Sequence, residues 1–406
     1  MGGTGVLIVG AMGHIAATVV VGASALKLSE TPRIGMVTDL GDFAGLGLPE
    51  PSEMVFGGWD IRSGNLGDAA RDILRKSALP DEGDAVSRIG NALERYSANI
   101  FLGTAANCGE AIRSLADGER EKACDSLEDL AGQMREDIRK FKNDNNLGSV
   151  VVVNLASTEP PLRLQVCHED PDAFEECLRR NDTGAIRAST LYAYAAVREK
   201  CPYINFTPSN AAMIPAIVRL AEQEGAPVMG NDGKTGETLI KSVLAPMFRS
   251  RNLEVMSWEG FNILGNMDGK VLDNPENRES KIRTKDRLLG EVLGYAPHSK
   301  VHINHVPSLG DQKTAWDFIH FRGFLGAAMS LQFTWQGYDS MLAAPLVLDL
   351  VRMAEFGRRR GESGLMPHLA CFFKEPLGVS EYAFPEQFGM LRRYAERARE
   401  EAKQGA

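Results

Sequence analysis

The stretch "GTGVLIVGAMGHIAATVVVGASALKL", residues 3–28, begins with an apolar run from Val6 to Val9, turns through glycines and continues with the spacing of a helix. A buried strand, a glycine turn and a helix in this order begin the βαβ unit that binds dinucleotides, in which the helix N-terminus faces a pyrophosphate. The turn reads GAMGHIA and not GxGxxG, because Met12 and Ala16 stand where the second and third glycines would be. By pattern alone, a cofactor turn and an ordinary strand-turn-helix of an α/β core fit equally well.

The first half of the chain continues with short apolar segments. The segment RIGMVTD predicts the next strand and places Asp39 where an acidic residue would meet an adenosine ribose. Further apolar runs alternate with helical segments such as 67–77 and 116–142; the runs are 99–107, 148–157 and 226–232. This alternation predicts an α/β fold, a Rossmann-type doubly wound parallel sheet with ligands beyond the carboxyl ends of its strands.

Polar residues follow several of these predicted strands. They either face a ligand at the edge of the sheet or cap the helices that come next. These residues are Asn154, Ser157, Thr158, Asn231 and Asp232.

The pattern changes near residue 242. From there to 340 the segments alternate polar and apolar residues as antiparallel strands do, which predicts an inserted α+β domain. We therefore expect a Rossmann domain over 1–241, the inserted domain over 242–340, and a helical segment over 341–406 that completes the first domain and ends in a solvated amphipathic helix.

The composition excludes several classes of function. A net charge of -9 over 406 residues argues against a general nucleic-acid or membrane-surface binder. Six cysteines without a CxxC pair suggest neither a disulfide framework nor a zinc site, so no metal is predicted and a reducing cytoplasm fits best. The N-terminal region has no basic segment and no uninterrupted membrane span, so we expect no export signal.

Cations gather in the segment 278–287 of this acidic chain, where they are Arg278, Lys281, Arg283, Lys285 and Arg287. Lys281 and Lys285 are four residues apart, so in a helix they project from one face. Two adjacent ammonium groups lower each other's pKa and suit a phosphate or an oxyanion. The alternative interpretation is a solvated basic face.

Two further lysines favour an anion site. Lys313 lies in SLGDQKTAWD, and Lys374 follows the apolar run LACFF, where a lysine is costly to bury unless an anion or a carboxylate receives it. Asp232, Asp268 and Asp339 lie in turn-like settings and either orient these lysines, bind hydroxyl groups, or are ordinary turn aspartates.

With these motifs the sequence resembles the myo-inositol-phosphate synthase family, NAD-dependent enzymes that convert glucose 6-phosphate into inositol phosphate. The resemblance covers nearly the whole chain, and its most specific motifs are VFGGWDIRSGNL (55–66), GNDGKTGETLIKSVLAPMF (230–248), FNILGNMDG (261–269), NPENRESKIRTK (274–285), PSLGDQKTAWD (307–317), GYDSMLAAPLVLDLV (337–351) and HLACFFKEPLG (368–378).

The resemblance implies roles for individual residues. The positions matching the family's NAD site are Gly10, Gly13, Asp60, Thr158 and Asp232; those matching its catalytic residues are Lys281, Lys313, Lys374, Asp268 and Asp339; and Lys285 and Ser280 match its binding site for the substrate phosphate. It further implies NAD as the cofactor, a sugar phosphate as the partner, and a homotetramer built through the inserted domain.

The reaction of this family implies a role for the cationic residues. Hydride leaves C5 of the open-chain sugar for NAD while Lys281, with Asp268 or Asp339 as relay, accepts the hydroxyl proton. C6 then attacks C1 in an aldol reaction, during which Lys313 and Lys374 stabilise the charged oxygens while Lys285 holds the phosphate. The hydride finally returns to C5, so the cofactor is regenerated.

Departures from the family pattern leave alternatives open. The turn GAMGHIA is unusual, its His14 is either an anion contact or a solvated residue at the start of a helix, and Asn231 replaces the first aspartate of the common GDD. Homologues in specialised metabolism are thought to cyclise fructose 6-phosphate to a five-membered carbocycle. A sugar-phosphate dehydrogenase that releases NADH and a non-catalytic NAD sensor are further alternatives.

Overall fold

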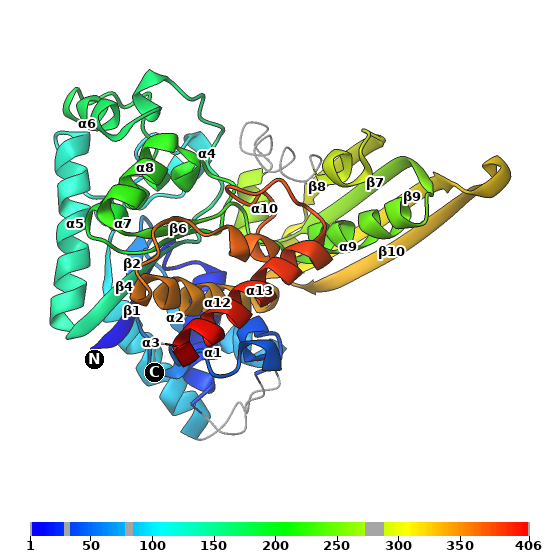
Figure 1. Ribbon diagram of the computed structural model, residues 1–406. Coiled ribbons are helices and arrows are strands. Elements are labelled where there is room, and N and C mark those ends of the chain that lie inside the picture. The colour runs from blue at the N-terminus through cyan, green and yellow to red at the C-terminus, as the bar shows by residue number, and fades with distance from the viewer. Residues whose placement is uncertain (1, 28–32, 78–83, 273–287, 405–406) are drawn as a thin grey trace.

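The computed structural model describes residues 2–27, 33–77, 84–272 and 288–404, and it contains two sheets (Figure 1). The first is a seven-stranded parallel sheet in the order β11-β6-β5-β4-β1-β2-β3. Its strands are β1 (Gly3–Val9), β2 (Val55–Asp60), β3 (Ile100–Leu102), β4 (Leu147–Asn154), β5 (Tyr203–Asn205), β6 (Pro227–Met229) and β11 (Gly364–Leu365).

Helices cover both faces of this sheet. On β1, Val6 and Ile8 pack in a core with the helices α1 (His14–Ala25), α3 (Asp84–Ala98) and α12 (Asp339–Arg359). Leu7 and Val9 face the other core, which includes α5 (Leu127–Asp144), α7 (Ala188–Arg198) and α8 (Pro215–Glu224). Successive β1 side chains thus enter opposite cores, and the predicted doubly wound α/β fold is confirmed.

The remaining helices connect the strands or close the chain. They are α2 (Leu66–Lys76), α4 (Glu110–Arg113), α6 (Pro171–Arg179), α9 (Gly236–Ser250), α10 (Met267–Leu272) and α13 (Phe384–Gln404). No helix within the described ranges is long and apolar enough to cross a bilayer. The helix predicted over 116–142 is shorter, because Ser126 caps α5 by accepting from the Asp129 N–H at 3.1 Å.

The predicted second strand, 33–39, is wrong. In the structure Val37–Asp39 is a 3-10 helix, since the N–H groups of Val37 and Thr38 donate to Asp349 of α12 at 2.6 and 3.0 Å. Asp39 pairs with Arg352 at 2.7 Å and does not end a strand. The strand beside β1 is β2, and Asp60 occupies its carboxyl end.

The second sheet has the order β10-β9-β7-β8 and extends away from the first as a long blade (Figure 1). Its strands are β7 (Glu254–Leu264), β8 (His298–His305), β9 (Gln312–Arg322) and β10 (Ala328–Tyr338). The predicted antiparallel pairing holds for β9 with β7 and β10, but β7 and β8 are parallel. A parallel pair requires a long connection between its strands, and the 33 residues 265–297 separate β7 from β8 in the sequence.

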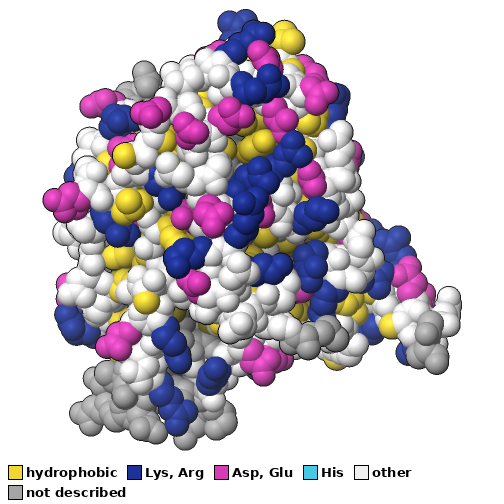
Figure 2. Space-filling model, turned by 90° about the vertical axis from the view of Figure 1, so that its left-hand side faces the viewer, with side chains coloured by type: hydrophobic (Ala, Val, Ile, Leu, Met, Phe, Trp, Pro, Cys, Tyr) yellow, Lys and Arg dark blue, Asp and Glu magenta, His cyan; other side chains and the backbone are white. Residues whose placement is uncertain are grey.

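Helix α9 covers one face of the second sheet, where Phe248 meets Trp258 edge to face at 6.3 Å between ring centroids. Residue 241 falls within α9 and residue 340 at the start of α12, so the domain division at these residues stays a prediction. At the opposite end of the molecule, Figure 2 shows positive and negative side chains interspersed over the face that includes α5 and α6. Ion pairs made by α5 include Arg139 with Glu199, 2.7 Å apart.

Candidate functional site

The glycine turn predicted from the sequence follows β1 and leads into α1. Gly10 has a φ of +86°, and a Cβ there would lie 3.0 Å from the Ala156 Cα, so the position requires glycine. No acidic residue lies in the first turn of α1, and no side chain caps it. The helix N-terminus can therefore receive an anion such as a phosphate.

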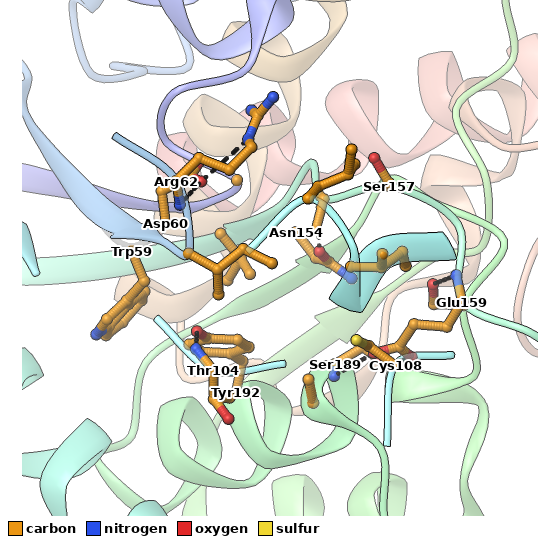
Figure 3. A pocket seen from close by; sticks show the side chains of 18 residues that line it. Trp59, Asp60, Arg62, Thr104, Cys108, Asn154, Ser157, Glu159, Ser189 and Tyr192 are labelled. Carbon is orange, nitrogen blue, oxygen red and sulfur yellow. Dashed lines mark hydrogen bonds and ion pairs between the residues drawn. The ribbon is translucent and has the colours of Figure 1, made fainter. Parts of the chain in front are cut away.

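An inner pocket, with an empty volume of about 620 Å³ that includes its open side, lies beyond the carboxyl ends of β1, β2 and β4 (Figure 3). Asp60 is buried in its wall and accepts from the Met12 N–H at 2.7 Å and the Arg62 N–H at 2.9 Å. Across the pocket, Tyr192 accepts from the Thr104 N–H at 3.0 Å. An acidic residue at the end of β2 is where a dinucleotide fold places a ribose contact.

Glu159 closes another part of the inner pocket. It is 4% exposed and accepts from the Ser189 N–H at 2.9 Å and from the Ser189 hydroxyl at 2.5 Å. Burial raises the pKa of Glu159, and burial also raises the pKa of Cys108, on the same wall, to about 12. The cysteine is therefore a protonated, unreactive thiol at neutral pH.

A wider cleft adjoins the inner pocket and runs from the glycine turn to the second sheet, with an empty volume of about 1630 Å³ that includes its open side. Several residues predicted from the sequence line it, namely Gly10, Gly13, Ser157, Thr158, Asp232, Lys313, Asp339 and Lys374. The fold thus brings the cofactor turn and the two lysines into one cavity, although these residues lie up to 364 positions apart in the sequence.

Lys374 and Asp232 form a buried ion pair in this cleft. The Lys374 Nζ lies 2.8 Å from the Asp232 Oδ1, and the two residues are 6% and 3% exposed. The Lys374 N–H also donates to the Asp232 carbonyl at 2.7 Å, which fixes the two segments side by side. Asp232 is thus the carboxylate that the apolar run before Lys374 requires.

Lys313, near the start of β9, faces Asp339 at the N-terminus of α12 across 3.5 Å. Lys281, Lys285 and Ser280 lie outside the described residues. Asp268 belongs to α10, and its side chain is likewise outside what the structure describes.

The structure corrects the predicted position of Asn231 and shows the surroundings of His14. Asn231 does not line the cleft, because it is fully buried with its side-chain amide against that of Asn205. His14 reaches the cleft, but its Nε2 lies 3.1 Å from Asp72 of α2. Among the described residues, this carboxylate is the acidic group nearest to the imidazole, and Asp311 follows at 4.0 Å.

The sequence analysis did not single out Asp311 or Arg62. Asp311 is 7% exposed, accepts from the Ser340 hydroxyl at 2.5 Å, and lies 3.9 Å from the Lys76 Nζ. Burial raises the pKa of Asp311. Its only signal was the aspartate in SLGDQK, two residues before Lys313, whereas a lone arginine such as Arg62 carries no pattern.

Among the described residues no group of three His, Cys, Asp or Glu side chains is arranged to hold a metal ion. The six cysteines are all free thiols. The parallel sheet, the glycine turn and the connected pockets therefore define a dinucleotide-binding α/β protein with a cationic cleft beside the cofactor site.

Comparison with known proteins shows to which family of dinucleotide-binding proteins the chain is similar. A family described as myo-inositol-1-phosphate synthase matches residues 4–395. The inositol-3-phosphate synthase 1 of Bacteroides thetaiotaomicron is 35% identical over 94% of this chain and 91% of that protein. The inositol-3-phosphate synthase of Dictyostelium discoideum is 33% identical over 76% of this chain, which spans 60% of that protein's length.

Solved structures of inositol-phosphate synthases and a related protein are similar to this chain in fold. The inositol-3-phosphate synthase of Caenorhabditis elegans superposes with a TM-score of 0.85 at 25% identity, covering 98% of this chain and 86% of that one. A myo-inositol-1-phosphate synthase-related protein of Thermotoga maritima has the same fold, with a TM-score of 0.77 at 23% identity over 97% and 98% of the two chains.

The chain belongs to the myo-inositol-1-phosphate synthase family. It is an isomerase-type enzyme, and its cofactor is NAD. The residues present fit this cofactor, because Gly10 adopts a positive φ and lies close to the Ala156 backbone, and the N-terminus of α1 is open to a phosphate.

Proposed function

We propose that the protein cyclises glucose 6-phosphate to an inositol phosphate. The observation that carries this proposal is the single cleft in which the glycine turn meets the pairs Lys313 with Asp339 and Lys374 with Asp232. Proximity of a redox cofactor to two ammonium groups suits a reaction in which an oxidation at one carbon is followed by charge development on two oxygens. The names of the relatives support the same assignment.

Bound NAD would accept a hydride from C5 and later return it. The chain's own contribution is electrostatic: Lys374 and Lys313 place ammonium groups where the enolate oxygen and the former aldehyde oxygen become charged. Asp232 and Asp339 hold these ammonium groups in place, and burial around Lys374 keeps water from weakening its field. Lys281, with Asp268 or Asp339, remains the predicted base, and Lys285 and Ser280 remain the predicted phosphate contacts.

Product analysis tests the proposal. Purified enzyme with NAD is incubated with glucose 6-phosphate and, separately, with fructose 6-phosphate, each free of isomerase, and the products are identified by carbon and phosphorus NMR. We expect a six-membered cyclitol phosphate from glucose 6-phosphate alone, without net NADH formation at 340 nm. A five-membered carbocycle from fructose 6-phosphate, or stoichiometric NADH, would replace the proposal with the corresponding alternative.

We further propose that the protein is a homotetramer assembled through the second sheet. The face of this sheet opposite α9 carries a row of stacked rings, in which Phe261 lies parallel to His302 at 4.4 Å and contacts Trp316 at 5.4 Å between centroids. Phe261 and Trp316 are still 37% and 38% exposed. Clustered exposed aromatic side chains are typical of an interface and not of a solvated sheet face.

Trp316→Glu is expected to dissociate the tetramer, because it would place a carboxylate among the stacked rings of the interface. Multi-angle light scattering of the wild type is expected to give about four times the chain mass, and of the variant a smaller species. Ile34→Glu is the control, because Ile34 is 87% exposed on the other domain. A wild type that is monomeric at micromolar concentration would rule the assembly out.

A further inference from the structure

The glycine turn of this chain has used up its own hydrogen-bond donors. The N–H groups of Gly10 and Ala11 donate to the Trp59 carbonyl at 2.9 and 3.0 Å, and that of Gly13 donates to the Gly10 carbonyl at 2.9 Å. The fourth, on Met12, donates to the Asp60 Oδ2 at 2.7 Å. A pyrophosphate at this turn can therefore receive N–H groups only from the start of α1, which leaves much of its charge uncompensated.

Arg62 lies where that charge would be. It lines both the inner pocket and the cleft, as do Gly10, Ala156 and Ser157, so it stands at the junction of the two cavities. If NAD bound with its adenosine in the inner pocket and its nicotinamide in the cleft, its pyrophosphate, which joins the two nucleosides, would pass this junction. Figure 3 shows Arg62 beside Asp60 on one side of the pocket.

The guanidinium of Arg62 is oriented by Asp60, and this contact uses only part of its hydrogen-bonding capacity. Its Nε lies 3.3 Å from the Asp60 Oδ1, and the same oxygen accepts the Arg62 N–H at 2.9 Å. No hydrogen-bond or ion-pair partner of the two terminal Nη groups lies among the described residues. A planar group fixed at one edge and open at the other is preorganised for a bidentate contact with a phosphate.

The other basic side chains that line the two cavities each lie near a carboxylate. His14 faces Asp72, Lys313 faces Asp339, and Lys374 faces Asp232, at 3.1, 3.5 and 2.8 Å respectively. The two lysines also belong to the end of the cleft at which the substrate is expected. Arg62 is thus the cation best placed to compensate the pyrophosphate.

We propose that Arg62 binds the pyrophosphate of NAD and replaces the backbone donors that the turn GAMG has spent on Asp60 and Trp59. The turn and Arg62 act together through Asp60. Its Oδ2 withdraws the Met12 N–H from the phosphate, and its Oδ1 orients the arginine that takes over the contact.

The test measures binding directly, without turnover. Dissociation constants of NAD, ADP, adenosine and NADP are determined by calorimetry for the wild type, Arg62→Gln, Arg62→Lys and Arg71→Gln. Arg71 is the control, because it lies on α2 with a 68% exposed side chain paired to Asp68. Thermal unfolding of each variant confirms that it is folded.

For Arg62→Gln we expect NAD and ADP to bind on the order of tenfold to a hundredfold more weakly, the effect of one charge-assisted contact. Adenosine, which has no phosphate, is expected to bind within about twofold of wild type. Arg62→Lys should recover part of the loss, since an ammonium keeps the charge but not the fork. Added salt should weaken NAD binding to the wild type more than to Arg62→Gln.

Three results would overturn the proposal. An equal loss for adenosine would mean that Arg62 acts by holding Asp60 at the ribose. A loss for NADP with NAD unchanged would mean that Arg62 contacts a 2′-phosphate. Unchanged binding of NAD and ADP would mean that the start of α1 suffices. Each result is independent of which sugar phosphate the enzyme cyclises.

Discussion

Replacing Lys374 by methionine is expected to lower kcat by a factor of about 10² to 10³, the usual effect of removing one group that stabilises a developing oxyanion. Methionine keeps an unbranched side chain as far as Cε and removes the ammonium group. The affinity for NAD, measured by calorimetry, should change much less. Lys140→Met is the matched control, because the Lys140 side chain is 60% exposed on α5 and remote from the cleft.

Stability must be separated from chemistry in this variant. Lys374→Met leaves the Asp232 carboxylate, which is 3% exposed, without its ammonium partner, and breaking such a buried pair costs about 3 to 5 kcal/mol. The double variant Lys374→Met/Asp232→Asn removes both charges and should recover most of the lost unfolding free energy. We expect it to remain as slow as the single variant. Recovery of turnover would show that Lys374 serves only to neutralise Asp232.

The course of the chain through the first sheet was only partly predictable. β1 is buried on both faces and therefore has the continuous apolar run by which it was recognised. β2 reads VFGGWD, and its adjacent glycines weaken the strand pattern. They are required by packing, since a Cβ on Gly58 would overlap the Ile8 carbonyl. The segment 33–39 has the more regular strand pattern, but its Val37 and Thr38 N–H groups are bound by Asp349 of α12.

In the candidate site, too, some features were predictable from the sequence and others were not. The place of Lys374 after an apolar run predicts a negatively charged partner, either an anion or a carboxylate, and the structure shows that Asp232 is the carboxylate. Asp60 was found through family resemblance, because no pattern separates it from other aspartates at strand ends. The proposed role of Arg62 depends on which backbone N–H groups the turn has already used. That information exists only in the folded chain.

Lys234, behind the cleft, predicts a dependence of stability on pH. It is 2% exposed, and its ammonium donates to Gln387 at the start of α13; within the part of the chain that the structure describes, it forms no ion pair with a carboxylate. Burial lowers the pKa of Lys234 from 10.5 to about 8, with a smaller lowering by Lys374, whereas Cys371 and Glu381 act in the opposite direction. The folded protein thus carries the cost of a buried cation at neutral pH.

The sign follows from the two pKa values. Between about pH 8 and 10.5 the unfolded chain holds the proton of Lys234 and the folded protein does not, so the free energy of unfolding rises with pH in this window. The slope is about 1.4 kcal/mol per pH unit, for a total on the order of 3 kcal/mol. Below pH 8 the contribution is constant, because both states are protonated.

Lys234→Met should abolish this contribution. The variant also deprives Gln387 of a donor, but that loss is the same at every pH and does not alter the slope. We therefore expect the stability of the wild type relative to Lys234→Met to be flat from pH 6.5 to 8 and to increase from pH 8 to 10.5. Unfolding is followed at one fixed protein concentration, because assembly would otherwise shift the midpoint. Parallel profiles would mean that Lys234 keeps its ordinary pKa in the folded protein. Burial of its charge beside α13 would then cost no stability at neutral pH.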